Sequence, residues 1–252
     1  MNYEKLVQGI LDIGEAMLQS GAENFRLEDS FYRMCRSYGF KRSDVFVIPS
    51  NIQVTVETPE GEIITQIRHI ESTGADYDKL NYLNAMSRYV CSHNPDEKEL
   101  VRRFKKVMAR PDQSELITGL AQITGGTAFA VFFGCDLQDA IVALIVCLMI
   151  VLVGRWLSRR EGNPMIYNLI LAFLSEVVIV TAVRSGLGHH PDRIMIGIVM
   201  LLVSALGAIN GMRDVMQRNF ISGSLEVMNS MLGAFGIAFG IALAMMLMGN
   251  IS

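Results

Sequence analysis

The pattern of apolar and polar residues changes at about residue 115 of this 252-residue chain. Before that point, apolar positions recur among polar ones at the spacing of amphipathic helices or half-buried strands. Beyond it, apolar residues form long runs that are separated by short polar gaps. The change predicts a water-soluble domain at residues 1–112 and a membrane domain at residues 113–252.

The first domain is predicted to contain four helices and three strands. Leu6, Ile10 and Ile13 repeat at helical spacing, and Gly39 ends a second helical segment. Shorter alternating segments follow, with turn residues between them. In chain order we expect helix 3–19, helix 23–38, strand 44–48, strand 52–58, strand 62–70, helix 76–92 and helix 96–108. This order is typical of a small α+β domain.

The second domain contains five apolar runs of about membrane-spanning length, which is about 20 residues for a helix. The predicted spans are 116–133, 137–154, 165–183, 194–212 and 226–248. A large soluble protein with buried core helices is the alternative, but five such runs would need a very large soluble shell. The expected fold is therefore an α-helical membrane protein with five transmembrane helices and an N-terminal α+β cytoplasmic domain.

Charge follows the same division, because 33 of the 47 Asp, Glu, Lys and Arg residues lie in the first 115 positions. The first residues carry mixed charge and begin an amphipathic helix rather than a signal peptide. Basic residues near the predicted spans share one side if the N-terminus is cytoplasmic. They are Arg102, Arg103, Lys105, Lys106, Arg110, Arg155, Arg159, Arg160, Arg213 and Arg218. We predict a multi-pass inner (plasma) membrane protein with its N-terminus in the cytoplasm and its C-terminus outside.

Several function classes are disfavoured by composition and motifs. A net charge of −3 gives no reason to expect a nucleic-acid partner. The four cysteines have no metal-ligand spacing, so we expect them to be reduced and structural. The sequence contains no nucleotide-binding GxxxxGK[ST] motif, nucleophile elbow or zinc motif. We therefore predict no metal, cofactor or catalytic residue, and we expect a lipid bilayer and a small-molecule substrate as partners.

The polar run at residues 20–29 is the densest candidate motif of the first domain. It contains Glu23, Arg26, Glu28 and Asp29 around a helix start. Acidic residues in a first helical turn are also expected from the helix dipole alone. The run therefore supports either a functional motif of the cytoplasmic domain or ordinary helix stabilisation.

Glu176 is the most unusual residue of the membrane domain, because it lies near the middle of the third predicted span. An ionisable side chain there costs roughly 3 kcal/mol on insertion scales, so it usually faces a cavity or a partner. We predict a substrate or proton site at Glu176. A hydrogen bond that joins two helices, or a protonated acid without further role, is the alternative.

Two further segments are candidates for the substrate pathway. Asn210 and Asp214 are i, i+4 neighbours that can present oxygen atoms together, with Arg213 beside them at the cytoplasmic boundary. The run Thr124-Gly125-Gly126 lies within the first span, where a Gly-Gly pair weakens a helix and exposes backbone groups. Close helix packing explains the glycines equally well.

Small residues also predict helix packing. Ser204, Gly207 and Gly211 share one face of the fourth span, and the fifth span contains a Gly236-xxx-Gly240 spacing. Both patterns favour the close approach of a neighbouring helix.

Four motifs in order resemble the threonine/serine exporter-like family. The first is Gly21-Ala22-Glu23 with Arg26-Leu27-Glu28-Asp29 and Tyr38-Gly39, and the second is segment 45–56 around Pro49. The third is the helix with Leu80, Asn84, Ser87 and Arg88, and the fourth is 202–223 with Asn210, Arg213-Asp214 and Ser222-Gly223. The family's Pro-Gly is Ser204-Ala205 here, so we expect its kink to be absent or softened. The family's Gly-Asp is Arg218-Asn219, which removes a cytoplasmic carboxylate.

The resemblance implies an inner-membrane exporter of small carboxylate-bearing metabolites, either threonine and serine or a dicarboxylate such as succinate. Short members of the family resemble one half of a longer transporter and work with a small multi-span partner subunit. An odd number of spans fits this, because a symmetric transporter then needs a second half or another copy. We expect proton coupling, and a homo-oligomer is also compatible. The alternative is a membrane-anchored hydrolase whose active site lies in the α+β domain.

Overall fold

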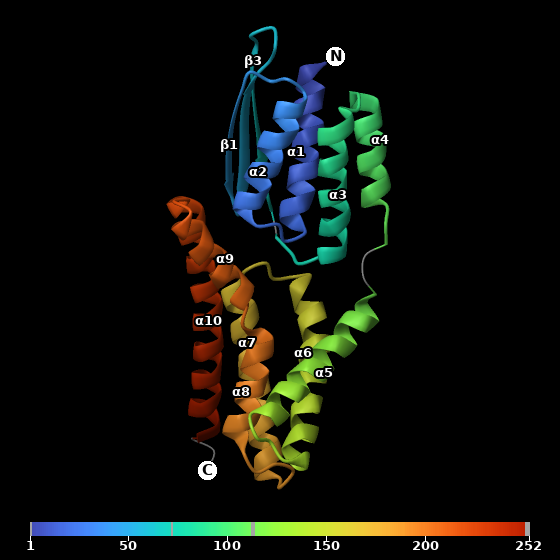
Figure 1. The fold of residues 1–252 in the computed structure, drawn as a ribbon. Coiled ribbons are helices and arrows are strands. Elements are labelled where there is room, and N and C mark those ends of the chain that lie inside the picture. The colour runs from blue at the N-terminus through green and yellow to red at the C-terminus, as the bar shows by residue number, and fades with distance from the viewer. Residues whose placement is uncertain (1, 72, 112–113, 250–252) are drawn as a thin grey trace. The chain divides into compact units, whose positions relative to one another are not determined.

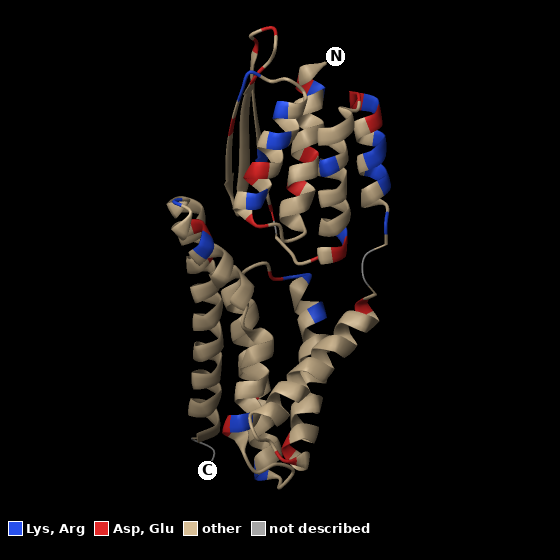
Figure 2. Cartoon of the chain, in the orientation of Figure 1, with Lys and Arg blue, Asp and Glu red and all other residues tan. Residues whose placement is uncertain are grey.

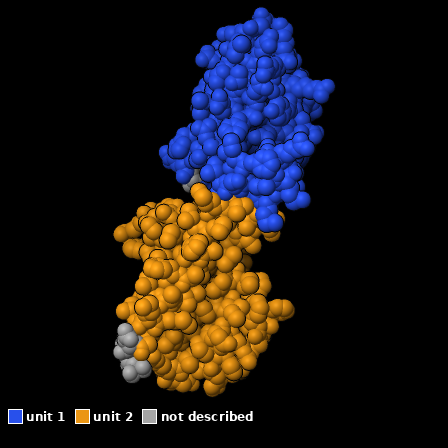
Figure 3. Space-filling model, turned by 90° about the vertical axis from the view of Figure 1, so that its left-hand side faces the viewer, with its two compact units in different colours: residues 1–113, 210–226 blue, residues 114–209, 227–252 orange. Residues whose placement is uncertain are grey.

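The computed structural model describes residues 2–71, 73–111 and 114–249. By its internal contacts the chain divides into two compact units, coloured separately in Figure 3. The first unit comprises residues 1–113 and 210–226, and the second comprises residues 114–209 and 227–252. The first unit thus includes a short segment from late in the chain, as well as the whole N-terminal part.

The N-terminal part of the first unit follows the predicted order of two helices, three strands and two helices. Its elements are α1 (Tyr3–Gln19), α2 (Asn24–Ser37), β1 (Arg42–Ile48), β2 (Asn51–Glu57), β3 (Ile63–His69), α3 (Tyr77–His93) and α4 (Glu97–Met108). Each boundary differs from the prediction by no more than two residues. Side-chain caps explain part of this agreement, because Asp76 accepts from the N–H of Lys79 at 3.0 Å as an N-cap should.

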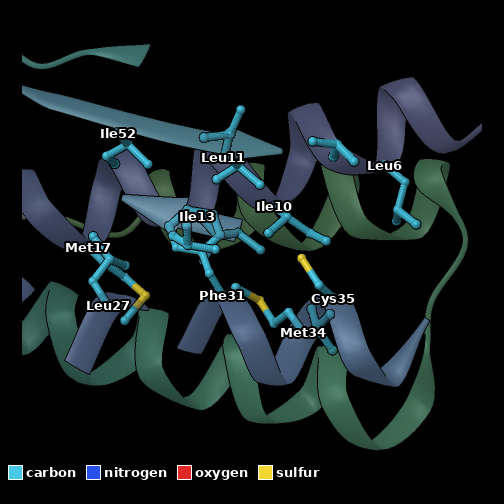
Figure 4. Close-up of a cluster of buried hydrophobic side chains, with 14 of the residues drawn as sticks. Leu6, Ile10, Leu11, Ile13, Met17, Leu27, Phe31, Met34, Cys35 and Ile52 are labelled. Atoms are coloured by element: carbon cyan, nitrogen blue, oxygen red, sulfur yellow. The ribbon is translucent and has the colours of Figure 1, made fainter. Parts of the chain in front are cut away.

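Helix α1 is the centre of this unit. It contacts strands β2 and β3 on one side and helices α3 and α4 on another (Figure 1). Its buried residues therefore lie on more than one face, with Leu6 and Ile10 on one and Leu11 and Leu18 on another. The core continues into α2, where the ring of Phe31 packs against α1 (Figure 4). Burial of this apolar surface is the main source of stability for the unit.

The sheet is antiparallel with the strand order β1-β2-β3. Alternate residues such as Val47, Ile52 and Val54 are buried against the helices, as the period of two in the sequence requires. Residues of the opposite face, such as Phe46 and Ile67, are exposed. The alternation in the sequence therefore predicted the strands and their inner face correctly.

The second unit is helical. It contains α5 (Glu115–Phe132), α6 (Leu137–Ser158), α7 (Pro164–Arg184), α8 (Pro191–Leu202), the beginning of α9 (Ala205–Met216) and most of α10 (Phe220–Gly249). Figure 2 shows few charged residues along these helices and many in α1–α4. Helices α7 and α8 both begin at a proline, which suits the first helical position.

The structure supports three to four membrane spans, and the five predicted spans stay a prediction. Among the described residues, α6, α7 and α10 are long and apolar enough to cross a bilayer, and the pair α8 and α9 makes a fourth if it is one broken span. Helix α5 does not qualify, because its glutamate, glutamine, threonines and glycines lower its apolar content. The fifth predicted run also begins earlier than expected, at Phe220 instead of residue 226.

The fourth predicted span is bent. Helix α8 ends at Leu202 and α9 begins at Ala205, with an angle of 54° between them. Val203 adopts an extended conformation at the break. The expectation that the kink would be absent at Ser204-Ala205 was therefore wrong, and whether it is softened stays a prediction. The break survives without Pro-Gly, so it does not depend on the missing N–H of a proline.

Glycines allow the helices of the second unit to pack closely. A Cβ atom on Gly207 would lie 2.8 Å from Ser230 Oγ, so α10 packs on the small-residue face of α9. A Cβ on Gly236 or Gly240 would collide with the backbone of α7. Both predicted packing faces are thus confirmed.

Candidate functional site

Four polar side chains of the first unit form a cluster around the buried Asn24. The Asn24 side-chain nitrogen lies 2.7 Å from Ser222 Oγ, 3.3 Å from Asp214 Oδ2 and 3.4 Å from Glu226 Oε2. Ser222 Oγ in turn donates to Asp214 Oδ2 at 3.0 Å. Asn24, Asp214 and Ser222 are buried, and Asp214 is only 2% exposed. Because buried polar groups need partners, these four side chains define each other's positions.

Three helix ends bring these residues together. Asn24 is the first residue of α2, Asp214 lies in the last turn of α9, and Ser222 lies in the first turn of α10. The α9–α10 connection is tight, and the N–H of Asn219 donates to the carbonyl of Asp214 at 2.9 Å. A Cβ on Gly223 would lie 2.5 Å from the carbonyl oxygen of Gly211, so only a glycine allows this approach of α10 to α9.

Charged side chains surround the cluster. Arg213 Nη1 donates to Glu23 Oε2 at 2.6 Å. Glu28 Oε1 accepts from the N–H of Val47 at 3.1 Å, and its Oε2 accepts from the Asn219 side chain at 3.3 Å. Burial raises the pKa of the Glu28 carboxyl. The segment 210–226 is thus joined to α2 by an ion pair and by several hydrogen bonds.

A cavity of about 240 Å³ opens beside the cluster. Ligand pockets for drug-sized molecules are usually about 300–1,000 Å³, so this cavity suits a smaller molecule. Its lining combines a carboxylate, a guanidinium, an amide and a hydroxyl with apolar side chains. The lining residues are Glu28, Phe46, Val47, Arg218, Asn219, Phe220, Ile221 and Ser222.

Glu176 lies in the second unit, on the packed face of α7. It is 2% exposed and shares this face with Ala172 and Ile179. Its neighbour Ser175 donates to the carbonyl of Leu171, which is a local bond within the same helix. Within the described part of the chain, the Glu176 carboxyl has neither a hydrogen bond nor an ion pair. Burial of a charged group without a partner is costly, which makes Glu176 an unusual residue of this helix.

A comparison with family models decides the identity of the chain. The ThrE model, described as "Putative threonine/serine exporter", matches residues 8–248. The chain belongs to the ThrE family. Searches of the curated proteins and of the solved structures found no match. ThrE is a family of exporter-type membrane transporters and not of enzymes, so the chain is a multi-pass membrane protein that acts on a small molecule in a lipid bilayer.

Most of the polar motif predicted in the first unit of this ThrE chain lies at or beside the cluster. Glu23 and Glu28 contact the segment 210–226, as described above. Arg26 is largely exposed and pairs with Glu23 at 3.2 Å. Asp29 instead pairs with Arg33 at 2.8 Å on an exposed part of α2, away from Asn24. Part of the run is therefore ordinary helix surface.

The pair Asn210 and Asp214 does not act as a single oxygen site. Asp214 is bound by Asn24 and Ser222, whereas Asn210 is half-buried and, among the described residues, has no side-chain hydrogen bond. Arg213 is exposed enough to reach solvent and contacts Glu23. Asp214 therefore belongs to the cluster and Arg213 lies beside it, whereas Asn210 lies one helical turn before Asp214 in α9.

The Gly-Gly pair of the first predicted span does not break a helix. Helix α5 is continuous from Glu115 to Phe132, and Thr124 Oγ1 donates to the carbonyl of Leu120 at 2.8 Å within it. Gly126 packs against α6, because a Cβ there would lie 2.5 Å from Cys147 Sγ. Gly125 has no atom within 4 Å of such a Cβ. Gly126 therefore fits the alternative interpretation, which was close packing of two helices.

Three members of the cluster, Asn24, Ser222 and Glu226, were not predicted as site residues, although Ser222 belongs to the fourth motif. A signal for Glu226 was present, because it is an acid within an apolar run and lies one turn after Ser222. Glu226 in α10 and Asp139 in α6 are further acids of spanning helices beside Glu176. Asn24 gave no signal, because its partners are about 190–202 positions away in the sequence.

Arg218, next to the cluster, has a left-handed backbone with φ of 71°. The family motif has glycine at this position, and a residue with a Cβ is disfavoured there by about 1 kcal/mol. We expect Arg218→Gly to stabilise the purified chain by up to about that amount, measured as a higher thermal unfolding temperature. Arg159→Gly, at a helix end with right-handed backbone, is the control and should not stabilise. An unchanged or lower unfolding temperature for Arg218→Gly would contradict the assigned turn.

Proposed function

We propose that this chain is the larger subunit of an inner-membrane exporter for small metabolites that carry a carboxylate. The observation that carries the proposal is the family match over residues 8–248, which includes both the N-terminal part and the helical part. Because a single match covers both parts, we infer that they act together in transport rather than as an enzyme and its anchor.

We infer that the polar cluster at Asn24 contacts the substrate on the cytoplasmic side of the membrane. The cavity beside it is lined by the Glu28 carboxylate and by Arg218, which complement the ammonium and the carboxylate of an amino acid. Asp214 adds a further carboxylate nearby. This balance supports threonine or serine over succinate, because a dicarboxylate lacks the ammonium group that these acids attract.

We further propose that Glu176 couples export to the proton gradient. Its carboxyl is buried in the middle of α7 without a partner among the described residues, and acids in this situation often belong to proton pathways. A proton bound on one side of the membrane and released on the other would link the state of α7 to the direction of transport.

The proposed topology has five spans, with α5 as the first, and places the N-terminus in the cytoplasm and the C-terminus outside. Helix α5 has 18 residues, nearly the length that a bilayer core requires. A chain with five spans lacks an inverted second half of its own. We therefore propose a small multi-span partner subunit, and a homo-oligomer is the second way to supply that half.

The alternative of a membrane-anchored hydrolase is not retained. The family consists of transporters, and the match covers the N-terminal domain in which the hydrolytic site was expected. The acidic residues of that domain bind Arg213 and Asn219 of the late segment instead.

Efflux from proteoliposomes tests the proposed function. Vesicles are loaded with labelled threonine or labelled succinate and contain the chain alone or the chain with its partner subunit. We expect proton-gradient-driven efflux of threonine only when both subunits are present. Efflux of neither compound under any condition would overturn the proposal, and efflux of succinate alone would overturn the assigned substrate class.

The same assay tests the role of Glu176. Glu176→Gln should lose at least about tenfold in gradient-driven efflux while its amount in the membrane is unchanged, because glutamine keeps the shape but carries no exchangeable acid proton. Glu115→Gln is the matched control, since the Glu115 side chain is 70% exposed. Gradient-driven efflux by Glu176→Gln at the wild-type rate would remove this residue from the coupling mechanism.

A further inference from the structure

Two aspartates and two histidines of the second unit meet at the beginnings of α6 and α8. Asp136 is the N-cap residue of α6 and Asp139 lies in its first turn, while His189 and His190 directly precede α8. His189 Nδ1 lies 2.9 Å from Asp136 Oδ2, and His190 Nδ1 lies 2.9 Å from Asp139 Oδ2. The hairpin before α6 and the loop before α8 are about 50 positions apart in sequence, so only the fold brings these side chains together.

Backbone groups hold the other oxygen of each carboxylate. Asp139 Oδ1 accepts from the N–H groups of His189 and His190, at 2.7 and 3.2 Å. Asp136 Oδ1 accepts from the N–H of Asp139 at 2.9 Å. The Oδ2 atom of each carboxylate faces an imidazole. A longer contact, from the N–H of Asp136 to Asp139 Oδ2 at 3.4 Å, completes the capping box. Each carboxylate is therefore oriented by fixed donors and offers its second oxygen to an imidazole, as outer hydrogen bonds orient metal ligands.

We propose that Asp136, Asp139 and His189 bind one divalent transition-metal ion of the zinc class. One ligand atom from each of these residues lies within 4.8 Å of the others. Zinc takes oxygen and nitrogen ligands at about 2.0–2.2 Å, so the three atoms need to draw inward by roughly an ångström. An imidazole together with carboxylates favours zinc, cobalt or nickel over calcium or magnesium.

Charge and access also suit such a site. Two carboxylates balance the two positive charges of the ion. The Asp139 side chain is fully buried, whereas the His189 and Asp136 side chains are 56% and 43% exposed, which leaves a path for the ion. On binding, the lone pair of His189 Nδ1 would bond the metal while Nε2 carries the remaining ring proton, and His190 keeps its contact with Asp139 as a positioning residue. The ion would then join the hairpin before α6 to the loop before α8.

Metal content of the purified full-length chain tests the site. The chain is prepared without a polyhistidine tag, equilibrated with micromolar Zn²⁺ and separated from free ion by gel filtration. We expect one zinc per chain by elemental analysis, a higher thermal unfolding temperature with zinc, and a visible Co²⁺ spectrum after exchange. His189→Gln and Asp136→Asn should each weaken zinc binding by at least about tenfold.

The chain supplies its own control, because its only other histidines are His69 and His93. The double variant His69→Gln/His93→Gln should keep one zinc per chain. Elution and helical content are compared for all variants, so that a loss of zinc is judged only in folded protein. No stoichiometric zinc in the wild type, or an equal loss in the control variant, would overturn the proposal and leave the cluster as a hydrogen-bonded loop contact. These readouts do not depend on transport, so they are independent of the proposed function.

Discussion

Asp214→Ala is expected to abolish export and to lower the stability of the chain. Asp214 is 2% exposed and accepts hydrogen bonds from the Asn24 amide and the Ser222 hydroxyl. Its removal takes the acceptor of the buried Ser222 hydroxyl and one of the acceptors of the Asn24 amide, at about 1–3 kcal/mol for an unsatisfied buried group. It also removes the contact that holds α2 to the α9–α10 connection within the first unit. The measurements are thermal unfolding of the purified chain and threonine efflux from proteoliposomes.

Asp214→Asn separates charge from shape, because asparagine is nearly isosteric with aspartate. We expect this variant to reach the membrane in normal amount and to lose most of its export. The matched control is Asp29→Asn in the same polar run, since Asp29 is exposed and bonded only to Arg33 among the described residues. Exposed pairs of this kind contribute at most about 1 kcal/mol. Wild-type efflux by Asp214→Asn would show that the carboxylate is structural and not part of the substrate path.

The second large effect is expected from a bulky residue at the α7–α10 contact. A Cβ on Gly236 would collide with the carbonyl of Met165 and would lie 3.1 Å from its Cα. A Cβ on Gly240 would collide with the carbonyl of Leu169 and would lie 3.0 Å from the backbone nitrogen of Phe173. Backbone atoms cannot rotate away as side chains do, so the two helices must separate. Overpacking of this kind costs about 1–3 kcal/mol per site, and more where the backbone has to move.

Gly236→Leu/Gly240→Leu should therefore prevent accumulation of folded protein in the membrane. Glu176 lies one helical turn beyond Ala172 and Phe173 on the same face of α7, so the burial of its carboxyl is expected to depend on this packing. The single variant Gly236→Ala tests the contact more gently and should lower the unfolding temperature.

The control for the glycine variants is Gly125→Ala in α5. This glycine is also in mid-helix, but no atom lies within 4 Å of an added Cβ. Alanine is favoured over glycine in a helix by about 1 kcal/mol, so this variant should be neutral or slightly stabilised. If Gly125→Ala and Gly236→Ala lowered the unfolding temperature equally, the effect would not come from the α7–α10 contact.

The candidate site was only partly accessible from the sequence. Asp214, Arg213, Glu23 and Glu28 were predicted because charges are rare after residue 115 and dense in residues 20–29. Asn24 and Ser222 were not assigned to a site, because an amide or a hydroxyl is common on any helix surface. The Gly-Gly pair in α5 was interpreted as a possible helix break, yet the break lies at 203–204. Helix propensity alone did not distinguish the two places, because tertiary packing decides at which weak point a helix breaks.

The sequence by itself determined the elements of the first domain, the apolar helices that follow and the family of the chain. These properties depend on the spacing of near neighbours along the chain, on hydropathy and on motif order, all of which can be counted in a linear string. Only the tertiary structure decided that Asn24 meets Asp214 and Ser222, that α10 packs against α7, and that two aspartates meet two histidines. These contacts join residues from about 50 to 200 positions apart. They form because buried polar groups must find partners and because helices approach closely only where glycines allow it.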